Sequence, residues 1–303
     1  MPTEPVVQAH RVSKTFAGTR VLKGVNFKIE RGEMVGLIGA SGSGKSTLIR
    51  SIAGLTPIDR CVNGAGHDDG EILLFSRAMQ QRGRIARSAN ALRARIGVVF
   101  QQFNLVPRLS VLTNVCLGQL GRMPLLQATL GQFSMEEKRS AMRAMMRVGI
   151  AEHALKRGCD LSGGQQQRAA IARTLVQGAE FLVADEPIAS LDPKSARRVM
   201  DILADLNKRD GITVLVSLHQ VEYALRYCPR TIALKAGEIV YDGPSSALTP
   251  EFLGSIYGAE SEDLFGLIDA RPATAELPAT VNGAMTFDLS RRSPADQRQR
   301  ARA

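Results

Sequence analysis

Short apolar runs, separated by polar or glycine-containing turns, mark most of this chain. Runs of this kind predict buried β-strands. The predicted strands span residues 6–12, 24–29, 34–38, 71–75, 95–100, 181–184 and 212–217, and a closing hairpin spans 232–241. Helices are predicted at residues 47–53, ending at Gly54, and at 194–208. Strands that alternate with helices indicate an α/β core.

The pattern changes between residues 103 and 177, where strand signals vanish and apolar residues return at helical spacing. Residues 135–148 show this with Met142, Met145, Met146 and Val148, which we interpret as packing positions. We expect a helical subdomain at about 103–177, inserted into one domain over 1–258. Residues 259–303 are rich in Ala, Pro and Arg and are predicted to be a partly disordered tail.

Length and composition place the chain among globular proteins, with 303 residues of which 44% are hydrophobic. Its apolar runs are far shorter than the roughly 18 residues that span a bilayer. The N-terminus lacks the profile of a secretory signal. We therefore expect a cytoplasmic protein that meets a membrane only through a partner. The cysteines, Cys61, Cys116, Cys159 and Cys228, have no metal-ligand spacing and are interpreted as ordinary thiols.

The formal net charge is +10, so nucleic acid, anionic lipid and plain solubility compete as explanations. Much of the excess is local. Residues 72–94 hold no acid, and arginines accumulate between residues 77 and 95. We expect that segment to be a helix or an exposed loop with a solvated face. The last 13 residues hold five Arg against one Asp. Net charge is thus weak support for nucleic-acid binding.

The chemistry of the chain centres on GASGSGKS at residues 39–46, between a predicted strand and a predicted helix. It fits the phosphate-loop pattern G-x-x-x-x-G-K-[ST] at each fixed position. Glycines let backbone N–H groups point at phosphate oxygens, the helix N-terminus and Lys45 add positive charge, and Ser46 can ligate Mg²⁺. We predict a nucleoside triphosphate site, "the phosphate loop", with Gly39, Ala40, Ser41, Gly42, Ser43, Gly44, Lys45, Ser46 and Thr47.

A second anion-binding helix end is predicted at LSGGQ, residues 161–165. Ser162 suits a helix N-cap, and Gly163 and Gly164 expose backbone N–H groups. Alone, such a segment is often only a cap. In a chain that also has a phosphate loop, the motif raises the question of which phosphate it binds, since one nucleotide site needs only one phosphate-binding loop.

Polar residues at strand ends supply further candidates. Asp185 ends an apolar strand and suits a Mg²⁺ ligand, while Glu186 can polarise an attacking water. Gln101 can reach a metal ion or its water, although an isolated glutamine is more often a surface residue. His219 can contact a γ-phosphate or be structural. Phe16 can stack on a base or be a core or hairpin residue.

Six motifs occur here in one order: the phosphate loop, the strand-end Gln, LSGGQ, the Asp-Glu pair, SLD at 190–192 and a late His. This set resembles the ATP-binding-cassette (ABC) ATPase family over roughly residues 6–257. The resemblance implies a P-loop NTPase core with an antiparallel β subdomain and an inserted helical subdomain. It also implies a head-to-tail homodimer, in which ATP on one phosphate loop contacts LSGGQ of the other copy.

The same resemblance implies the residue roles. Phe16 would stack on adenine, Gln101 would sense the Mg²⁺ held by Ser46 and Asp185, Glu186 would be the catalytic base and His219 would hold the γ-phosphate. LSGGQ, with Ser162, Gly163, Gly164 and Gln165, would contact the other copy's ATP. Asp192 would communicate across the dimer.

Three stretches, at 100–115, 184–193 and 217–225, look like the ATPase subunit of bacterial phosphonate importers. This implies a peripheral protein on the cytoplasmic face of the inner membrane, partnered by two permeases and, indirectly, a periplasmic substrate-binding protein. Residues 103–108 would then meet a permease helix. The alternatives are an ABC ATPase for another small polar substrate, such as an amino acid, and a soluble ABC ATPase acting on nucleic acid. The substrate does not follow from residue chemistry.

Overall fold

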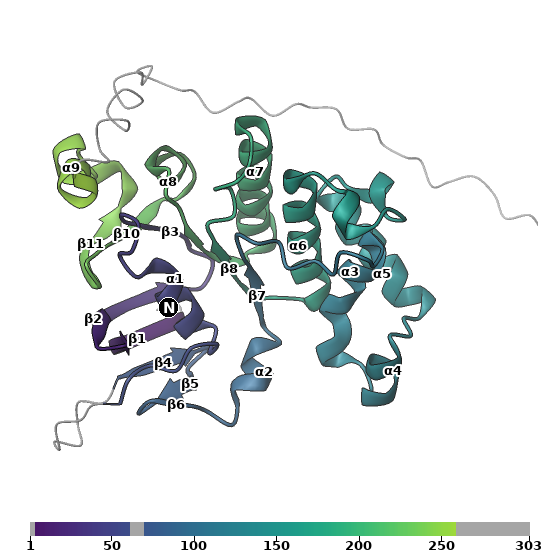
Figure 1. Cartoon of the computed structure of the whole chain (residues 1–303), viewed down its shortest axis with the longest axis horizontal. Coiled ribbons are helices and arrows are strands. Elements are labelled where there is room, and N and C mark those ends of the chain that lie inside the picture. Colours follow the sequence, from purple (N-terminus) through teal and green to yellow (C-terminus); the bar gives the residue numbers. More distant parts are fainter. Residues whose placement is uncertain (1–3, 61–69, 259–303) are drawn as a thin grey trace, which may run out of the picture. The chain divides into compact units, whose positions relative to one another are not determined.

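The computed structural model describes residues 4–60 and 70–258 (Figure 1). Contacts divide the chain into two units, residues 1–269 and 270–303, and all described residues belong to the first. The tail predicted for 259–303 and Cys61 lie outside the described residues.

Two sheets form the frame. The antiparallel sheet has the order β2–β1–β4–β5–β6 and consists of β1 (Pro5–Phe16), β2 (Thr19–Glu30), β4 (Glu71–Leu74), β5 (Arg77–Gln81) and β6 (Arg84–Ile85). The other sheet has the order β11–β10–β3–β9–β8–β7, parallel except for β11. Its strands are β3 (Met34–Ile38), β7 (Ile96–Val99), β8 (Phe181–Asp185), β9 (Thr213–Ser217), β10 (Arg230–Lys235) and β11 (Glu238–Pro244).

The parallel sheet is buried on both faces, which is why its strands are apolar throughout rather than alternating. On β3, Val35 and Leu37 belong to one hydrophobic core, and Met34 and Ile38 belong to the other. The first core lies between the two sheets and includes Leu48, Ile49 and Ile52 of α1 (Lys45–Ile52). Figure 1 shows α1 in this position.

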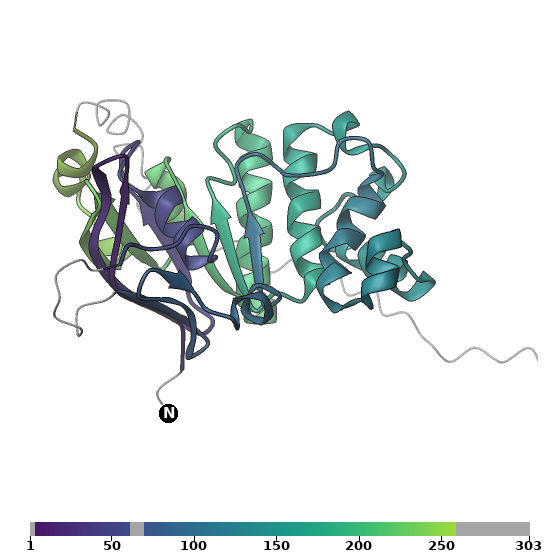
Figure 2. The ribbon, with the colours of Figure 1, turned by 60° about the horizontal axis from the view of Figure 1, so that its bottom comes forward.

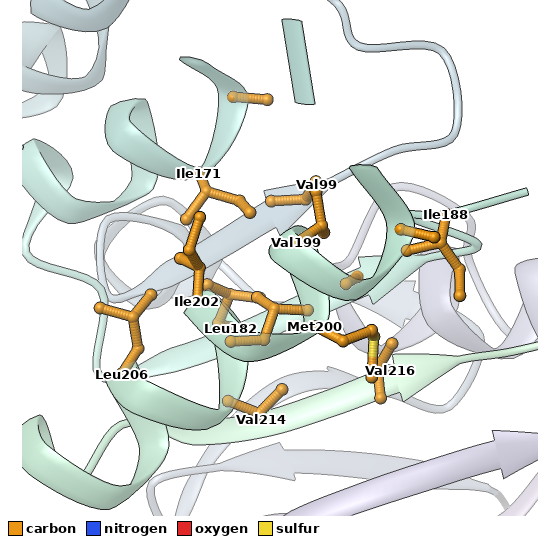
Figure 3. Packing of buried hydrophobic residues seen from close by; sticks show 14 of the residues in the cluster. Val99, Ile171, Leu182, Ile188, Val199, Met200, Ile202, Leu206, Val214 and Val216 are labelled. Atoms are coloured by element: carbon orange, nitrogen blue, oxygen red, sulfur yellow. The ribbon is translucent and has the colours of Figure 1, made fainter. Parts of the chain in front are cut away.

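Helices cover the opposite face of the parallel sheet. They are α6 (Gly163–Gln177), α7 (Pro193–Asp210) and α8 (Val221–Tyr227). The α7 residues Val199, Met200 and Ile202 pack with Leu182 of β8 and Val214 of β9 (Figure 3). The phosphate loop and LSGGQ thus introduce helices on opposite faces of one sheet.

The helical subdomain lies between β7 and β8 in the chain and stands to one side of the parallel sheet in Figure 2. It comprises α3 (Val111–Cys116), α4 (Leu125–Leu130), α5 (Met135–Arg147), α6 and the 3₁₀ turns Leu117–Arg122, Ala151–His153 and Gly158–Asp160. Met145 is fully buried and Met142 packs on the core, as predicted. The packing role predicted for Met146 is wrong, because its side chain is 59% exposed.

The arginine-rich segment is not the helix or exposed loop that we expected. Residues 77–85 form β5 and β6, and only Ala89–Arg93 is helical, as α2. Arg95 makes a two-pronged ion pair with Glu180, at 2.6 and 2.9 Å, and lies 3.7 Å from the ring centre of Phe75. These residues form strands because β5 pairs with β4 and β6 pairs with β5, and a count of charges does not reveal such pairing. Helix α9 (Pro250–Tyr257), the short 3₁₀ turn Ser245–Ala247 and helix α8 were also not predicted.

Candidate nucleotide site

The phosphate loop connects β3 to α1 and packs too closely on its neighbours to carry side chains at two of its glycines. Gly39, Gly42 and Gly44 have φ of +150°, +76° and +107°. A Cβ on Gly39 would lie 2.1 Å from the carbonyl oxygen of Leu234, and one on Gly44 would lie 3.0 Å from that of Val21. Ser41 and Gly42 are exposed at the tip of the loop, and Thr47 is half-buried in the first turn of α1. Strands β10 and β2 therefore hold the loop in its curled form.

Lys45 lies inside this curl, with only 4% of its surface exposed. Its Nζ donates to the carbonyl oxygens of Gly39 at 2.7 Å and Ala40 at 3.2 Å, and lies 3.9 Å from Oε1 of Glu186. The Oγ of Ser43 is buried and has no hydrogen-bond partner among the described residues. A buried hydroxyl without a partner suits a ligand rich in acceptor oxygens.

The two predicted acids meet the loop at the end of β8. Oδ1 of Asp185 accepts hydrogen bonds from the hydroxyls of Ser46, at 3.0 Å, and Ser217, at 2.9 Å. The Ser217 hydroxyl also accepts the backbone N–H of Glu186 at 2.8 Å. Glu186 has φ of +48°, a left-handed conformation that is uncommon for a residue other than glycine. This turn brings its carboxylate within ion-pair distance of Lys45.

Strand register places Gln101 and His219 along the same sheet edge. Val99 pairs with Ala184, and Ser217 pairs with Leu37 and with Asp185, so both polar residues lie two positions beyond a paired residue. Both are exposed. The ring of His219 lies edge-on to the ring of Tyr257, with centroids 6.2 Å apart. Gln101 and His219 thus follow the carboxyl ends of neighbouring parallel strands, as Asp185 and Glu186 do.

Phe16 is not a core residue. It ends β1, is 46% exposed, and has the Lys14 Nζ 5.2 Å from its ring centre. Residues Val21 and Leu22 of the same hairpin contact the phosphate loop at Gly44. An exposed ring on a hairpin that touches this loop suits stacking on a nucleotide base.

LSGGQ forms a capped helix start, as predicted. The Ser162 Oγ accepts the Gln165 N–H at 3.4 Å, and the Gln165 Oε1 accepts the Ser162 N–H at 2.9 Å. A Cβ added to Gly163 would lie 3.3 Å from the ring of Phe103, in the loop after Gln101. Because α6 covers the face of the sheet opposite α1, this motif does not sit beside the chain's own phosphate loop.

Asp192 is the N-cap of α7, with Oδ1 accepting the N–H groups of Lys194 at 3.1 Å and Ser195 at 3.0 Å. The hydrogen bonds from Ser195 hold the pKa of Asp192 below its ordinary value. A capping role therefore exists within one chain, and communication across a dimer remains a prediction.

Two residues of this site were missed. Ser217 connects Asp185 to Glu186, and its signal was a hydroxyl ending an apolar strand beside the acidic one. The Tyr257 hydroxyl accepts the Gly39 N–H at 3.1 Å, from a helix more than two hundred residues further along the chain. Nothing in the local sequence around Tyr257 indicates that contact.

In the described part of the chain, no group of three or more His, Cys, Asp or Glu side chains could hold a metal by itself. Mg²⁺ is usually bound by one or two carboxylates, waters and substrate phosphates. Asp185 and the Ser46 hydroxyl, already 3.0 Å apart, are suitable donors.

None of the described helices combines the length and apolar content needed to cross a bilayer.

Comparison with known proteins adds the family. The chain is 55% identical over 278 residues to the phosphonates import ATP-binding protein PhnC of Stutzerimonas stutzeri, covering 91% of this chain and 99% of that protein. It is 54% identical to the protein of the same name from Caulobacter vibrioides, covering 88% and 98%. A solved dimeric bacterial ABC transporter cassette matches with a TM-score of 0.68 at 33% identity, over 80% of this chain and all of that one. Residues 22–189 match the ABC transporter family, to which this chain therefore belongs.

Proposed function

We propose that this chain is the ATP-hydrolysing subunit of a phosphonate importer. The observation that carries the proposal is the pair of phosphonate-import relatives, about 55% identical along nearly their whole lengths, together with a complete phosphate site. The peripheral location expected is the cytoplasmic face of the inner membrane, beside two permeases that receive substrate from a periplasmic binding protein.

The residues present suit ATP and Mg²⁺. The phosphate loop offers backbone N–H groups, the unpartnered Ser43 hydroxyl and the buried Lys45 charge to the phosphate oxygens. Ser46 and Asp185 would hold Mg²⁺, assisted by Gln101, and the bound ion would neutralise charge on the β- and γ-phosphates. Phe16 would cover the base. A solved ABC cassette that this chain matches at 33% identity is a post-hydrolysis dimer bound to ADP and Pi.

Glu186 is suited to orient and deprotonate the attacking water. Its backbone is fixed by Ser217, and its carboxylate lies at the edge of the phosphate site, 22% exposed. His219, supported by the Tyr257 ring, would hold the γ-phosphate from the neighbouring strand end. Such positioning and charge compensation supply most of the catalysis in phosphoryl transfer.

The placement of LSGGQ supports a two-copy site. Its helix start lies across the sheet from the phosphate loop of the same chain, so a second copy arranged head to tail would bring the two together. ATP would then join the copies and hydrolysis would release them. Phe103, which lies against Gly163, would connect this closure to a permease seated on residues 103–108, where Val106 is 42% exposed.

The test uses the chain assembled with its permeases in vesicles. Methylphosphonate uptake should require ATP, and Glu186→Gln should reduce turnover by roughly 10²–10⁴-fold while trapping an ATP-bound dimer. Parallel assays with phosphate, phosphite and amino acids identify the substrate class. Uptake of an amino acid but not of methylphosphonate would overturn the assignment of phosphonate as the transported substrate. A Glu186→Gln chain that stays monomeric in saturating ATP and Mg²⁺ overturns the paired site.

A further inference from the structure

A pocket outside the nucleotide site lies between the N-terminal halves of α6 and α7. Its volume is about 530 Å³. Its lining consists of Arg168, Lys194, Ser195, Arg197, Arg198 and Asp201. None of these side chains has a role in the hydrolysis described above.

The charges of this pocket are unbalanced. Four of the lining residues are cationic and one is acidic. The single carboxylate, Asp201, already accepts a hydrogen bond from the Tyr227 hydroxyl at 2.8 Å. Among the described residues, no ion pair involves Arg168, Arg197 or Arg198, unlike Arg95, Arg147 and Arg230, which all have acidic partners. The lining therefore carries an excess of positive charge, with Asp201 as its one acidic residue.

The guanidinium groups of Arg168 and Arg198 both lie near Gly149. Around Gly149, Arg198 and Arg168 approach within 3.3 and 3.4 Å of the position that a side-chain Cβ would take. Arg168 is anchored there, donating to the carbonyl oxygens of Gly149 at 2.7 Å and Val148 at 3.3 Å. Burial, and then the charge of Arg198, lower its pKa. An anion in the pocket would offset the repulsion between these two positive charges.

We propose that this pocket binds a small, doubly charged oxyanion of the phosphate or phosphonate type, and that binding acts on LSGGQ. Guanidinium groups match the oxygens of such an anion in planar, two-pronged hydrogen bonds. A volume of about 530 Å³ accommodates one with its water. The proposal rests on the charge of the lining residues and does not depend on which compound the transporter carries.

The route to LSGGQ is short. The Nε of Arg168 donates to the carbonyl oxygen of Gly164, within the motif, at 3.3 Å. A Cβ on Gly164 would lie 2.8 Å from the side chain of Ser195, another lining residue. Arg168 and Ser195 thus belong to both the pocket and the surroundings of the motif. A ligand that reorients either residue changes the surface that LSGGQ offers to the ATP of a second copy.

The test measures binding to the full chain by calorimetry at constant ionic strength. A saturating non-hydrolysable ATP analogue with Mg²⁺ keeps the probes out of the phosphate loop. Inorganic phosphate and methylphosphonate are titrated separately, so the two sources of the same chemistry are distinguished. The variant R197Q/R198Q removes two exposed pocket charges, and R139Q/R143Q removes two exposed charges from α5 as the matched control.

We expect at least one probe to bind wild type and the control equally, with Kd in the millimolar range or below, and to bind R197Q/R198Q roughly tenfold more weakly or not at all. The same probe should change the ATPase rate of wild type and leave that of R197Q/R198Q unchanged. Absence of binding, or equal loss in both double variants, overturns the site. Binding without any change in ATPase rate overturns its action on LSGGQ. Neither result alters the transport assay that tests the proposed function.

Discussion

The hydroxyl of Tyr257, in the last turn of α9, accepts a 3.1 Å hydrogen bond from the backbone N–H of Gly39, the first residue of the phosphate loop. Tyr257 is only 4% exposed, and its ring lies against His219. A residue from the end of the described chain thus contacts both the loop that receives phosphates and the histidine expected to hold the last of them.

We predict that Tyr257→Phe weakens ATP binding about two- to tenfold, since a hydrogen bond of this kind contributes roughly 0.5–1.5 kcal/mol. The ring and its contact with His219 are retained. KM for ATP should rise more than kcat falls. Tyr241→Phe is the matched control, because it removes a hydroxyl that donates to the Pro244 carbonyl on β11. Equal KM values for the Tyr257 variant and wild type would contradict the role of this contact.

Gly39→Ala should abolish nucleotide binding and lower the free energy of unfolding by more than about 1 kcal/mol. The backbone strain of an alanine at this positive φ would by itself cost about 1 kcal/mol. The added Cβ would also meet the Leu234 carbonyl oxygen at 2.1 Å. Gly211→Ala separates the two effects, since it has φ of +67° and open space around the Cβ. Urea unfolding and ATP-analogue titration give the comparison. If both variants lost unfolding free energy to a similar extent, the close contact between the added Cβ and the Leu234 carbonyl would be shown to be unimportant.

Phe16→Ala should raise the Kd of ATP and GTP by similar factors, because stacking uses the face of any base and contributes about 1–3 kcal/mol per base. Phe16→Tyr, which keeps a stacking ring, should bind as wild type does. Because Phe16 is 46% exposed, neither variant should change the unfolding midpoint appreciably. A large loss of stability with unchanged nucleotide affinity would indicate a packing role instead.

Glu180→Gln should lower the free energy of unfolding at pH 7 by about 0.5–1 kcal/mol, a modest value because the pair is partly exposed. The hydrogen bond from Arg95 lowers the pKa of Glu180 from its ordinary value of 4.5. The pair therefore stabilises the fold above about pH 4.5, and this contribution disappears as pH falls through the lower, folded-state pKa. Urea unfolding at several pH values should show wild type and variant converging in acid. Glu238→Gln, on the exposed side of β11, should show no such convergence.

Local pattern predicted most of the framework. β3 coincides with the apolar run at 34–38, and β8, β9 and the C-terminal hairpin fall within one to three residues of their predicted ends. Strands β3, β8 and β9 are buried on both faces, so their composition alone distinguishes them. Arginine-rich β5 and β6 lack that signal, because backbone pairing of β5 with β4, and of β6 with β5, holds them.

Residues adjacent in the chain are enough to reveal the chemistry of the site, because the phosphate loop, the capped start of LSGGQ and the acids at the end of β8 are all local patterns. The distant groups that complete the site depend on how the chain folds. Ser217 bridges Asp185 and Glu186 because β8 and β9 are neighbours, and Tyr257 reaches Gly39 because α9 folds back onto the loop. Likewise, Arg168 and Arg198 both lie near Gly149 because α6 packs against α7, and such long-range contacts carry no local pattern.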